Sequence, residues 1–162
     1  MRRTRLGIGT AIAAGALAVT GLAFAPTAMA VMPATATATY DCGFFGGGTA
    51  QLDAVQSGSS ITITVTTAVT TPLPIQPGDA ATTLRLALNG SGQAVFSGSN
   101  NPQMDAGDPY NSGPLTSSTS FVTGDSLDSL DPGVGPGLSL TIFGTTVDCD
   151  AVTDQSAPFV AS

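Results

Sequence analysis

Five aspartates in two loops could supply the oxygen ligands of a metal site. Within each loop they recur at every third position, as Asp105, Asp108, Asp125, Asp128 and Asp131. Carboxylate oxygens are hard ligands, and Ca²⁺ takes about six to eight of them. Neither group has the D-x-D-x-D-G pattern of a calcium loop, and ordinary aspartate-rich turns look the same. The sequence therefore assigns no metal and no cofactor, and these five residues are its candidates for Ca²⁺.

One serine lies in a motif known for nucleophiles. Gly124-Asp125-Ser126-Leu127 matches the signature of the GDSL lipases and esterases. Their mechanism needs a histidine base to activate the serine, and this chain has no histidine. We therefore interpret the stretch as a turn in which Asp and Ser side chains bond their own backbone. The sequence predicts that the protein is not an enzyme, with a secreted hydrolase as the remotest alternative.

The first thirty residues have the pattern of a secretory signal peptide. Three arginines precede an apolar run over 6–25, and Ala28-Met29-Ala30 fits the small-x-small cleavage rule. An uncleaved membrane anchor is the alternative, because about 20 apolar residues can span a bilayer. We predict a signal peptide over 1–30, one domain over 31–155, a C-terminal tail over 156–162, and a secreted protein.

The charge left after cleavage excludes two classes of partner. Arg85 is then the single basic residue against eleven acidic ones, all of them aspartates. Such a field repels nucleic-acid phosphates and anionic lipid, so we expect neither nucleic-acid binding nor membrane-surface binding. We also expect no membrane insertion after the signal peptide is cleaved. The chain has no tryptophan to stack on a sugar. Tyr110 is the remaining loop aromatic for a ligand hypothesis, against the alternative of an exposed tyrosine packing on its own loop.

Alternation of apolar and polar residues predicts β-strands throughout the rest of the chain. The pattern is cleanest over 34–42 and 61–67, where threonine alternates with small or β-branched apolar residues. Tyr40 is expected on the core face, and Phe44 is expected to extend the same inward set. Further strands are predicted over 49–55, 84–88, 93–97, 115–123 and 138–142, with polar connections over 98–114 and 124–137.

Two turns follow from local sequence. Asn89-Gly90 predicts a tight hairpin, because both residues tolerate positive φ. The inward parity changes between Ile142 and Val147, and the change falls at Gly144. A one-residue shift would turn every later side chain to the wrong face, so we expect a bulge or a tight turn at this glycine.

The two cysteines lie in the first and last predicted strands, at Cys42 and Cys149. Two cysteines in an exported chain most often pair, so we predict a disulfide that links the terminal strands. About seven or eight short antiparallel strands separated by turns favour an all-β, immunoglobulin-like β-sandwich. The missing tryptophan and the wide cysteine spacing distinguish it from an antibody-type domain.

Four short motifs occur in order along this domain: Tyr40-x-Cys42 before a Gly-rich turn, Gly113-Pro114-Leu115-Thr116, Leu138-Ser139-Leu140-Thr141 and Val147-x-Cys149. With them the chain resembles a family of uncharacterised immunoglobulin-like β-sandwich domains secreted by GC-rich bacteria. The likeness spans most of the chain after the leader. It implies a sandwich with bridged terminal strands and no catalytic residues, and the cysteine pair alone is carried over.

The sequence as a whole predicts a secreted, non-enzymatic structural or interaction module that acts at or outside the cell surface. The sequence does not identify its partner, and the candidates are an extracellular protein and a cell-surface glycan. The alternative is a Ca²⁺-assisted glycan or surface-ligand binder that uses loops 99–113 and 124–137. Self-association is a further hypothesis, because the threonine-rich strands over 35–39 and 61–67 would be adhesive at an open sheet edge.

Overall fold

The computed structural model describes residues 30–131 and 133–162, so the predicted signal peptide lies outside the described residues except for Ala30. The described chain is all-β, with one short 3₁₀ turn, η1 (Gly43–Phe45). Its strands are β1 (Thr35–Asp41), β2 (Gly47–Ser57), β3 (Ser60–Thr70), β4 (Ala80–Leu88), β5 (Gly92–Gly98), β6 (Pro109–Thr116), β7 (Ser126–Ser129), β8 (Leu138–Ile142), β9 (Thr145–Ala151) and β10 (Phe159–Val160).

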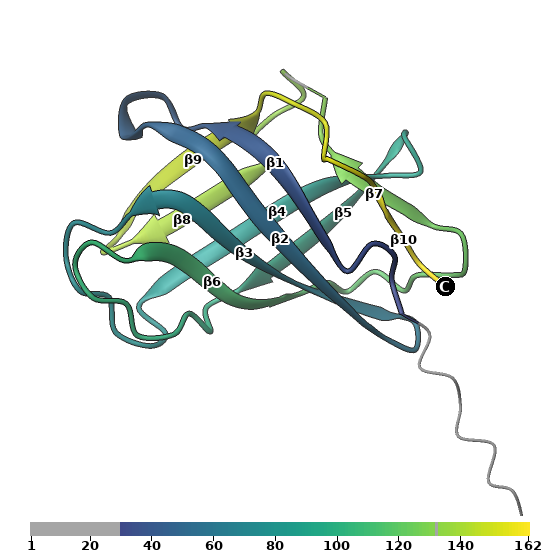
Figure 1. Ribbon diagram of the computed structural model, residues 1–162, viewed down its shortest axis with the longest axis horizontal. Helices are drawn as coiled ribbons and strands as arrows, with labels where there is room; N and C mark the ends of the chain where they lie inside the picture. The colour runs from purple at the N-terminus through teal and green to yellow at the C-terminus, as the bar shows by residue number, and fades with distance from the viewer. Residues whose placement is uncertain (1–29, 132) are drawn as a thin grey trace, which may run out of the picture.

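The strands form one sheet that closes on itself into an eight-stranded antiparallel barrel (Figure 1). Around the ring the order is β4, β5, β6, β3, β2, β1, β9 and β8. Closure occurs where Ala80–Leu84 of β4 pairs with β8. The other half of the same β4 edge, Leu86–Leu88, pairs with β7, and β7 in turn pairs with β10. The strand β4 thus divides one edge between two partners.

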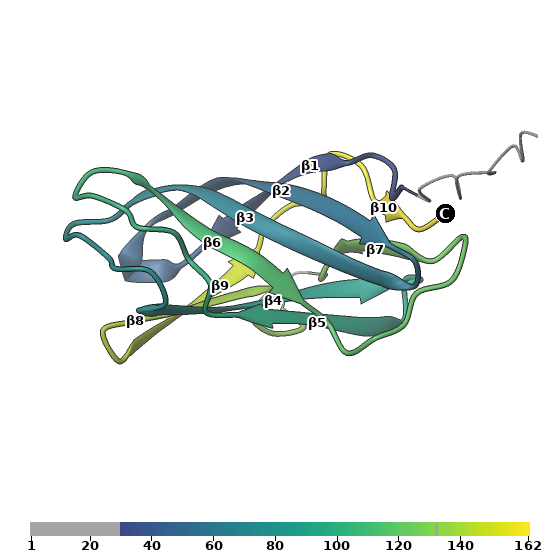
Figure 2. The same cartoon turned by 90° about the horizontal axis from the view of Figure 1, so that it is seen from below.

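This closure corrects the predicted immunoglobulin-like sandwich. A sandwich has two separate sheets with free edges, whereas here the two layers seen from the side in Figure 2 are joined by the pairing of β1 with β9 and of β5 with β6, and the pairing of β4 with β8 completes the ring. Both architectures bury one face of each strand, so both produce the same alternation of apolar and polar residues. The all-β content was therefore predicted correctly, and the arrangement of the strands was wrong.

The predicted inward faces of β1, β2 and β3 are confirmed. The buried positions in these strands are Ala36, Ala38, Tyr40, Ala50, Leu52, Ala54, Ile61, Ile63 and Val65. The intervening positions are mostly threonines that lie partly or fully exposed on the outer surface. β-branched residues suit such a pleated wall, because the strand conformation leaves their χ1 angle in a favoured state.

Both predicted turns are also present. Asn89 and Gly90 lie in the hairpin turn between β4 and β5, and both have positive φ, of 53° and 70°. The parity change at Gly144 is a second tight hairpin, between β8 and β9, in which Phe143 has φ 50° and Gly144 has φ 76°. Phe143 is forced into this strained conformation and its side chain is exposed.

Four segments differ from the expected boundaries. The connection predicted over 98–114 contains most of β6, and the one predicted over 124–137 contains β7. The segment 115–123 is strand only as far as Thr116, and the expected tail over 156–162 includes β10, with Phe159 buried. Proline, glycine and asparagine make β6 look like a loop. It pairs with β3 all the same, through register shifts that accommodate these residues.

The predicted disulfide between Cys42 and Cys149 is confirmed, and it spans 107 positions of sequence. It lies where β1 meets β9, a contact with only two paired positions, Tyr40 with Ala151 and Asp41 with Asp150. By contrast, β1 and β2 pair at seven positions. The bridge therefore fastens one of the shortest seams of the barrel.

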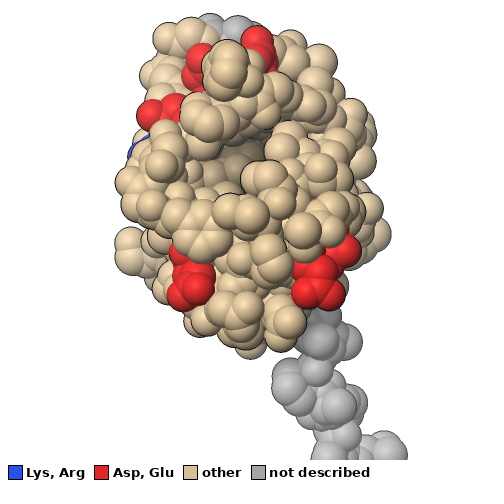
Figure 3. All heavy atoms as spheres, turned by 90° about the vertical axis from the view of Figure 1, so that its left-hand side faces the viewer, with Lys and Arg blue, Asp and Glu red and all other residues tan. Residues whose placement is uncertain are grey.

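The two ends of the barrel differ. At one end Phe121 packs on Phe96, with ring centroids 5.9 Å apart, and its backbone N–H donates to the Ser59 carbonyl. The first and last described segments meet at the same end, where Met32 and Val160 bond each other through their backbones. The opposite end carries η1, the β3–β4 loop and the β8–β9 turn, and it is hollow (Figure 3).

Candidate ligand-binding cavity

The open end of the barrel encloses a cavity of about 490 Å³. Its walls come from strand ends that are far apart in sequence but adjacent in the barrel. The lining residues are Cys42, Phe45, Val69, Thr70, Thr71, Pro72, Leu73, Ile75, Tyr110, Leu140, Ile142, Phe143, Thr145 and Val147. A cavity of this size falls within the usual range for small-molecule sites, about 300 to 1,000 Å³.

The wall residues reach the cavity because the inward alternation continues to the strand ends. Leu140 and Ile142 extend the inward face of β8, and Val147 lies in β9 opposite Leu140. Leu73 and Ile75 come from the β3–β4 loop, which is fixed to the β5–β6 loop by paired backbone hydrogen bonds between Ile75 and Met104, at 2.9 and 3.0 Å. The loop that walls the mouth is therefore hydrogen-bonded in place.

The buried hydroxyls of the cavity wall already have protein partners. Tyr110 shares a hydrogen bond with Thr82, with 2.7 Å between the two oxygens. The Thr71 hydroxyl donates to the Asp105 carbonyl at 2.9 Å. Burial raises the pKa of Tyr110, and the bond to Thr82 offsets only part of that rise. The phenol is therefore neutral and engaged at ordinary pH.

No charged side chain is among the residues that line the cavity. An ionised ligand would lose its hydration there without meeting an opposite charge, which is strongly unfavourable. In the buried part of the wall, a hydrogen-bonding ligand would have to compete with the existing bonds of Tyr110 and Thr71. The chemistry of the wall thus favours a neutral, largely apolar molecule.

Large apolar side chains surround the mouth on the outside. Phe44 and Phe45 of η1 are 99% and 54% exposed, Leu73 is 58% exposed, and Phe143 is 61% exposed. The expectation that Phe44 points inward was wrong. The chain leaves β1 after Asp41 and turns through Gly43, with φ 60°, which breaks the alternation before Phe44 is reached.

A second, much smaller cavity lies beside the first, between β1, β2, β3 and β8. Its volume is about 20 Å³, enough for roughly one water molecule. Tyr40 borders it, and burial raises the pKa of this tyrosine to about 12. The nearby Ser129 hydroxyl acts in the opposite direction on this pKa, and neither hydroxyl makes a hydrogen bond. This space is too small for a ligand.

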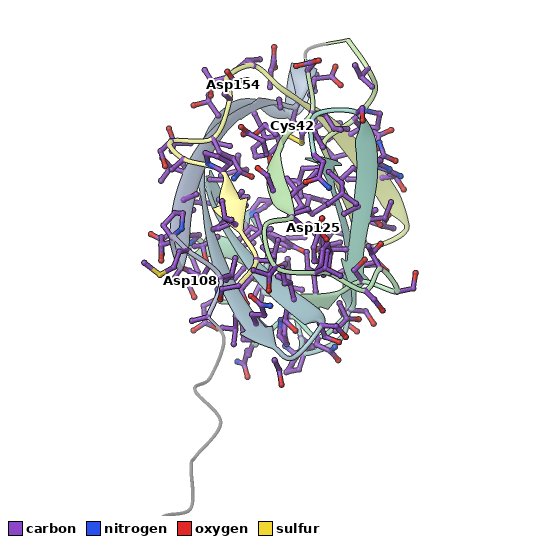
Figure 4. All side chains as sticks on the ribbon, turned by 90° about the vertical axis from the view of Figure 1, so that its right-hand side faces the viewer. Cys42, Asp108, Asp125 and Asp154 are labelled. Carbon is purple, nitrogen blue, oxygen red and sulfur yellow. A yellow bond between two sulfur atoms is a disulfide. The ribbon has the colours of Figure 1, made fainter. Side chains whose placement is uncertain are left out.

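The five candidate calcium ligands are separated between the two ends of the barrel. Asp105 and Asp108 lie in the β5–β6 loop at the mouth, where the Asp108 carboxylate accepts the Asp105 N–H at 2.8 Å. Asp125 lies at the other end, the one that faces the viewer in Figure 4, and its backbone carbonyl accepts the Ala161 N–H. The loops 99–113 and 124–137 therefore do not combine into one ligand surface.

The carboxylates of the second group are engaged with the protein. Asp125 accepts from the Asn89 amide and the Val122 N–H, both at 2.9 Å, and these bonds lower its pKa. Asp128 accepts from the backbone of Ser129 and Gln155, while Asp131 is exposed. Within 30–131 and 133–162, no three or more acidic, cysteine or histidine side chains converge as a metal would require.

Ser126 begins β7 and is half-buried. Its backbone N–H donates to the Asn89 side chain and its carbonyl accepts the Asn89 N–H, at 2.9 and 2.8 Å. These bonds fasten β7 to the β4–β5 hairpin. With no histidine anywhere in the chain, the surroundings of this serine contain no base of the usual kind.

Sequence reasoning identified Tyr110 and missed the rest of the cavity. Tyr110 is buried in the wall instead of exposed on its own loop. A usable signal was present in the connections, where Phe44-Phe45, Leu73 and Phe143 place large apolar residues at positions normally occupied by polar ones. Exposed apolar side chains in several turns at one end of a barrel indicate a binding surface.

Fold and cavity together define the class of this protein: an eight-stranded antiparallel barrel, disulfide-bonded, with an apolar pocket at one open end. Comparison with protein-family models, with curated proteins and with solved structures finds no match. The predicted resemblance to secreted immunoglobulin-like domains accordingly stays a prediction, and the sandwich that it implied is corrected. Over the part of the chain that the structure describes, helices long and apolar enough to cross a membrane are absent.

Proposed function

We propose that the protein is a binding module that holds a small, neutral, apolar molecule in the open end of its barrel. The observation that carries this proposal is the cavity of about 490 Å³, whose lining contains no charged residue and whose buried hydroxyls are bonded to the protein. Concave, mostly apolar sites of this volume are the usual form of small-molecule pockets.

The proposal develops the ligand-binding alternative from the sequence and changes its chemistry. The separation of Asp108 from Asp125 gives no support to a calcium-assisted glycan site shared by the two loops. A non-enzymatic, secreted protein remains our expectation, since a disulfide is compatible with an extracellular location. A structural module without a ligand would have no need of an apolar hollow open to solvent.

The test is saturable binding of N-phenyl-1-naphthylamine, an uncharged dye whose fluorescence rises in apolar surroundings. We expect a hyperbolic increase with protein concentration and competition by neutral lipids such as a monoacylglycerol. Fatty acids at neutral pH should compete poorly, because their carboxylate finds no positive charge in the cavity. Absence of a saturable signal from the folded protein would refute the proposal.

A pair of neighbouring variants locates the signal. Thr145 is exposed at the mouth and lines the cavity, so Thr145→Trp should fill the entrance and weaken dye binding about tenfold or more. Thr146 is the next residue, is exposed and is not part of the lining, so Thr146→Trp should leave binding unchanged. Equal effects from the two variants would place the dye elsewhere on the protein.

A further inference from the structure

We infer that the rim of the mouth docks on an uncharged lipid surface, with phosphatidylcholine-type head groups, from which the cavity takes up its apolar ligand. This inference rests on the proposed function and adds the surface that supplies the ligand. We call the exposed apolar group of Phe44, Phe45, Leu73 and Phe143 the rim.

The distribution of phenylalanine shows that the rim is not ordinary scattered exposure. Phe44, Phe45 and Phe143 are all exposed by more than half and all lie at the mouth. The other phenylalanines of residues 30–131 and 133–162 are Phe96, Phe121 and Phe159, which are buried. Leu73 adds a fourth apolar side chain from a separate loop. Three different connections thus present apolar groups at one end, which is the arrangement expected of an interaction site.

The rim is continuous with the interior of the cavity. Phe45, Leu73 and Phe143 are each exposed to solvent and also line the cavity. Phe44 extends the patch outward, with its ring packed edge-on against that of Phe45, 6.0 Å between centroids. A molecule that leaves a lipid phase under this rim would pass from one apolar environment to the next without crossing water, which removes the main barrier to its transfer.

Charge decides between a lipid surface and a second copy of the chain. Exposed aspartates flank the mouth, with Asp41 next to Cys42 and with Asp105 and Asp108 in the loop bonded to Thr71, and Figure 3 shows acidic side chains around the hollow. Two such ends would repel each other, as would an anionic membrane. The outermost group of phosphatidylcholine is a quaternary ammonium cation, which is opposite in sign to these carboxylates.

Basic residues do not neutralise the negative charge of the aspartates around the mouth. Arg85 is the single basic residue of the described chain, and its guanidinium bonds the Pro136 carbonyl and the Ser139 hydroxyl on the outer wall, at 3.3 and 3.2 Å. Neither Pro136 nor Ser139 belongs to the cavity lining. The mouth therefore combines apolar side chains with negative charge, and a neutral surface with exposed choline groups fits both.

The experiment is flotation of the protein with phosphatidylcholine vesicles, together with dye binding in solution. Phe44 is fully exposed and does not line the cavity, so Phe44→Ser separates the two properties. We expect this variant to lower the vesicle-bound fraction about tenfold, because the phenylalanine ring is no longer available for burial in the lipid surface. Dye binding should stay unchanged. Val55→Ser is the control, since Val55 is 67% exposed on β2 and does not line the cavity.

Each result distinguishes this inference from the proposed function. Dye binding without flotation overturns lipid docking and leaves the ligand site intact. Flotation without dye binding overturns the proposed function and, with it, ligand uptake. Stronger flotation on vesicles containing anionic lipid would contradict the charge argument. A concentration-dependent dimer in sedimentation that Phe44→Ser abolishes would identify a second copy as the occupant of the rim and overturn the lipid surface.

Discussion

Removal of the Cys42–Cys149 bridge should destabilise the barrel far more than a typical substitution. The bond closes a loop of 107 residues, and the loop-entropy relation then gives a stabilisation of about 4.8 kcal/mol at 25 °C. Unfolding of a domain of about 130 residues has an entropy of about 0.28 kcal/mol per kelvin near 60 °C. The double variant Cys42→Ala with Cys149→Ala should therefore melt about 15 to 20 °C below the natural protein.

The position of the bridge gives a second reason to expect a large effect. It fastens β1 to β9, whose backbones pair at two positions only. If that seam opens, the closed barrel becomes a curved sheet with two free edges, which invites association with other chains. Alanine is the better replacement, because Cys149 is fully buried and a serine hydroxyl there would need a hydrogen-bond partner.

Differential scanning calorimetry measures the effect, with a phosphine reductant as the matched control. Reductant should lower the Tm of the natural protein toward that of the double variant and should not shift the variant itself. A decrease of less than about 5 °C would refute the reasoning. It would mean that side-chain packing at the β1–β9 seam, rather than the covalent link, holds the barrel closed.

Two further predictions concern stability. Burial raises the pKa of Tyr40 to about 12, whereas its value in the unfolded chain is about 10. The folded state therefore keeps the phenol proton to higher pH, and the free energy of unfolding, unaffected below pH 10, should fall by about 1.4 kcal/mol at pH 11. Urea unfolding would measure this decrease, and Tyr40→Phe should remove it. Gly113 has φ 63° and an added Cβ would collide with the Asn100 carbonyl oxygen, so Gly113→Ala should cost about 3 kcal/mol. Gly107→Ala, at φ 96° in open space, should cost only about 1 kcal/mol, and equal losses for the two glycine variants would contradict the collision argument.

Local features of the fold could be predicted from sequence because they depend on near neighbours. The alternation of threonine with apolar residues in β3 determines which face is buried, whatever the strand pairs with. Asn89-Gly90 selects its turn through the backbone conformations that those two residues allow. The disulfide could be predicted from the presence of just two cysteines in a chain with a predicted export signal.

Strand pairing could not be predicted in this way. Closure of the barrel depends on β4 pairing with β8, which begins fifty residues after β4 ends at Leu88. Nothing in the alternation of either strand names its partner, because hydrogen bonding in a ladder is independent of side-chain type. The strand β6 was missed for a related reason. Pro109, Gly113 and Pro114 are unfavourable in a strand, and the long-range pairing with β3 overrides them.

The cavity is a consequence of barrel closure, and it therefore could not be predicted from the sequence either. Its lining comes from strand ends that only a barrel brings together. A sandwich of the same strands would have its two sheets in contact, about 10 Å apart, and no hollow between them. The sequence shows that Phe44 and Phe143 lie in predicted connections. They indicate a binding surface only when the fold places both at the same end of the barrel.

The meeting of the first and last described segments bears on how the molecule can be tethered. Ala30 and Ser162 are joined by a hydrogen bond from the serine hydroxyl to the alanine carbonyl at 2.7 Å. Figure 1 shows the C-terminus at the end of the barrel away from the β8–β9 turn. A linker or partner domain joined at either point would leave from the same base. The open end of the pocket would then point away from the attachment site. A circular permutant that joins these two residues should keep the same barrel.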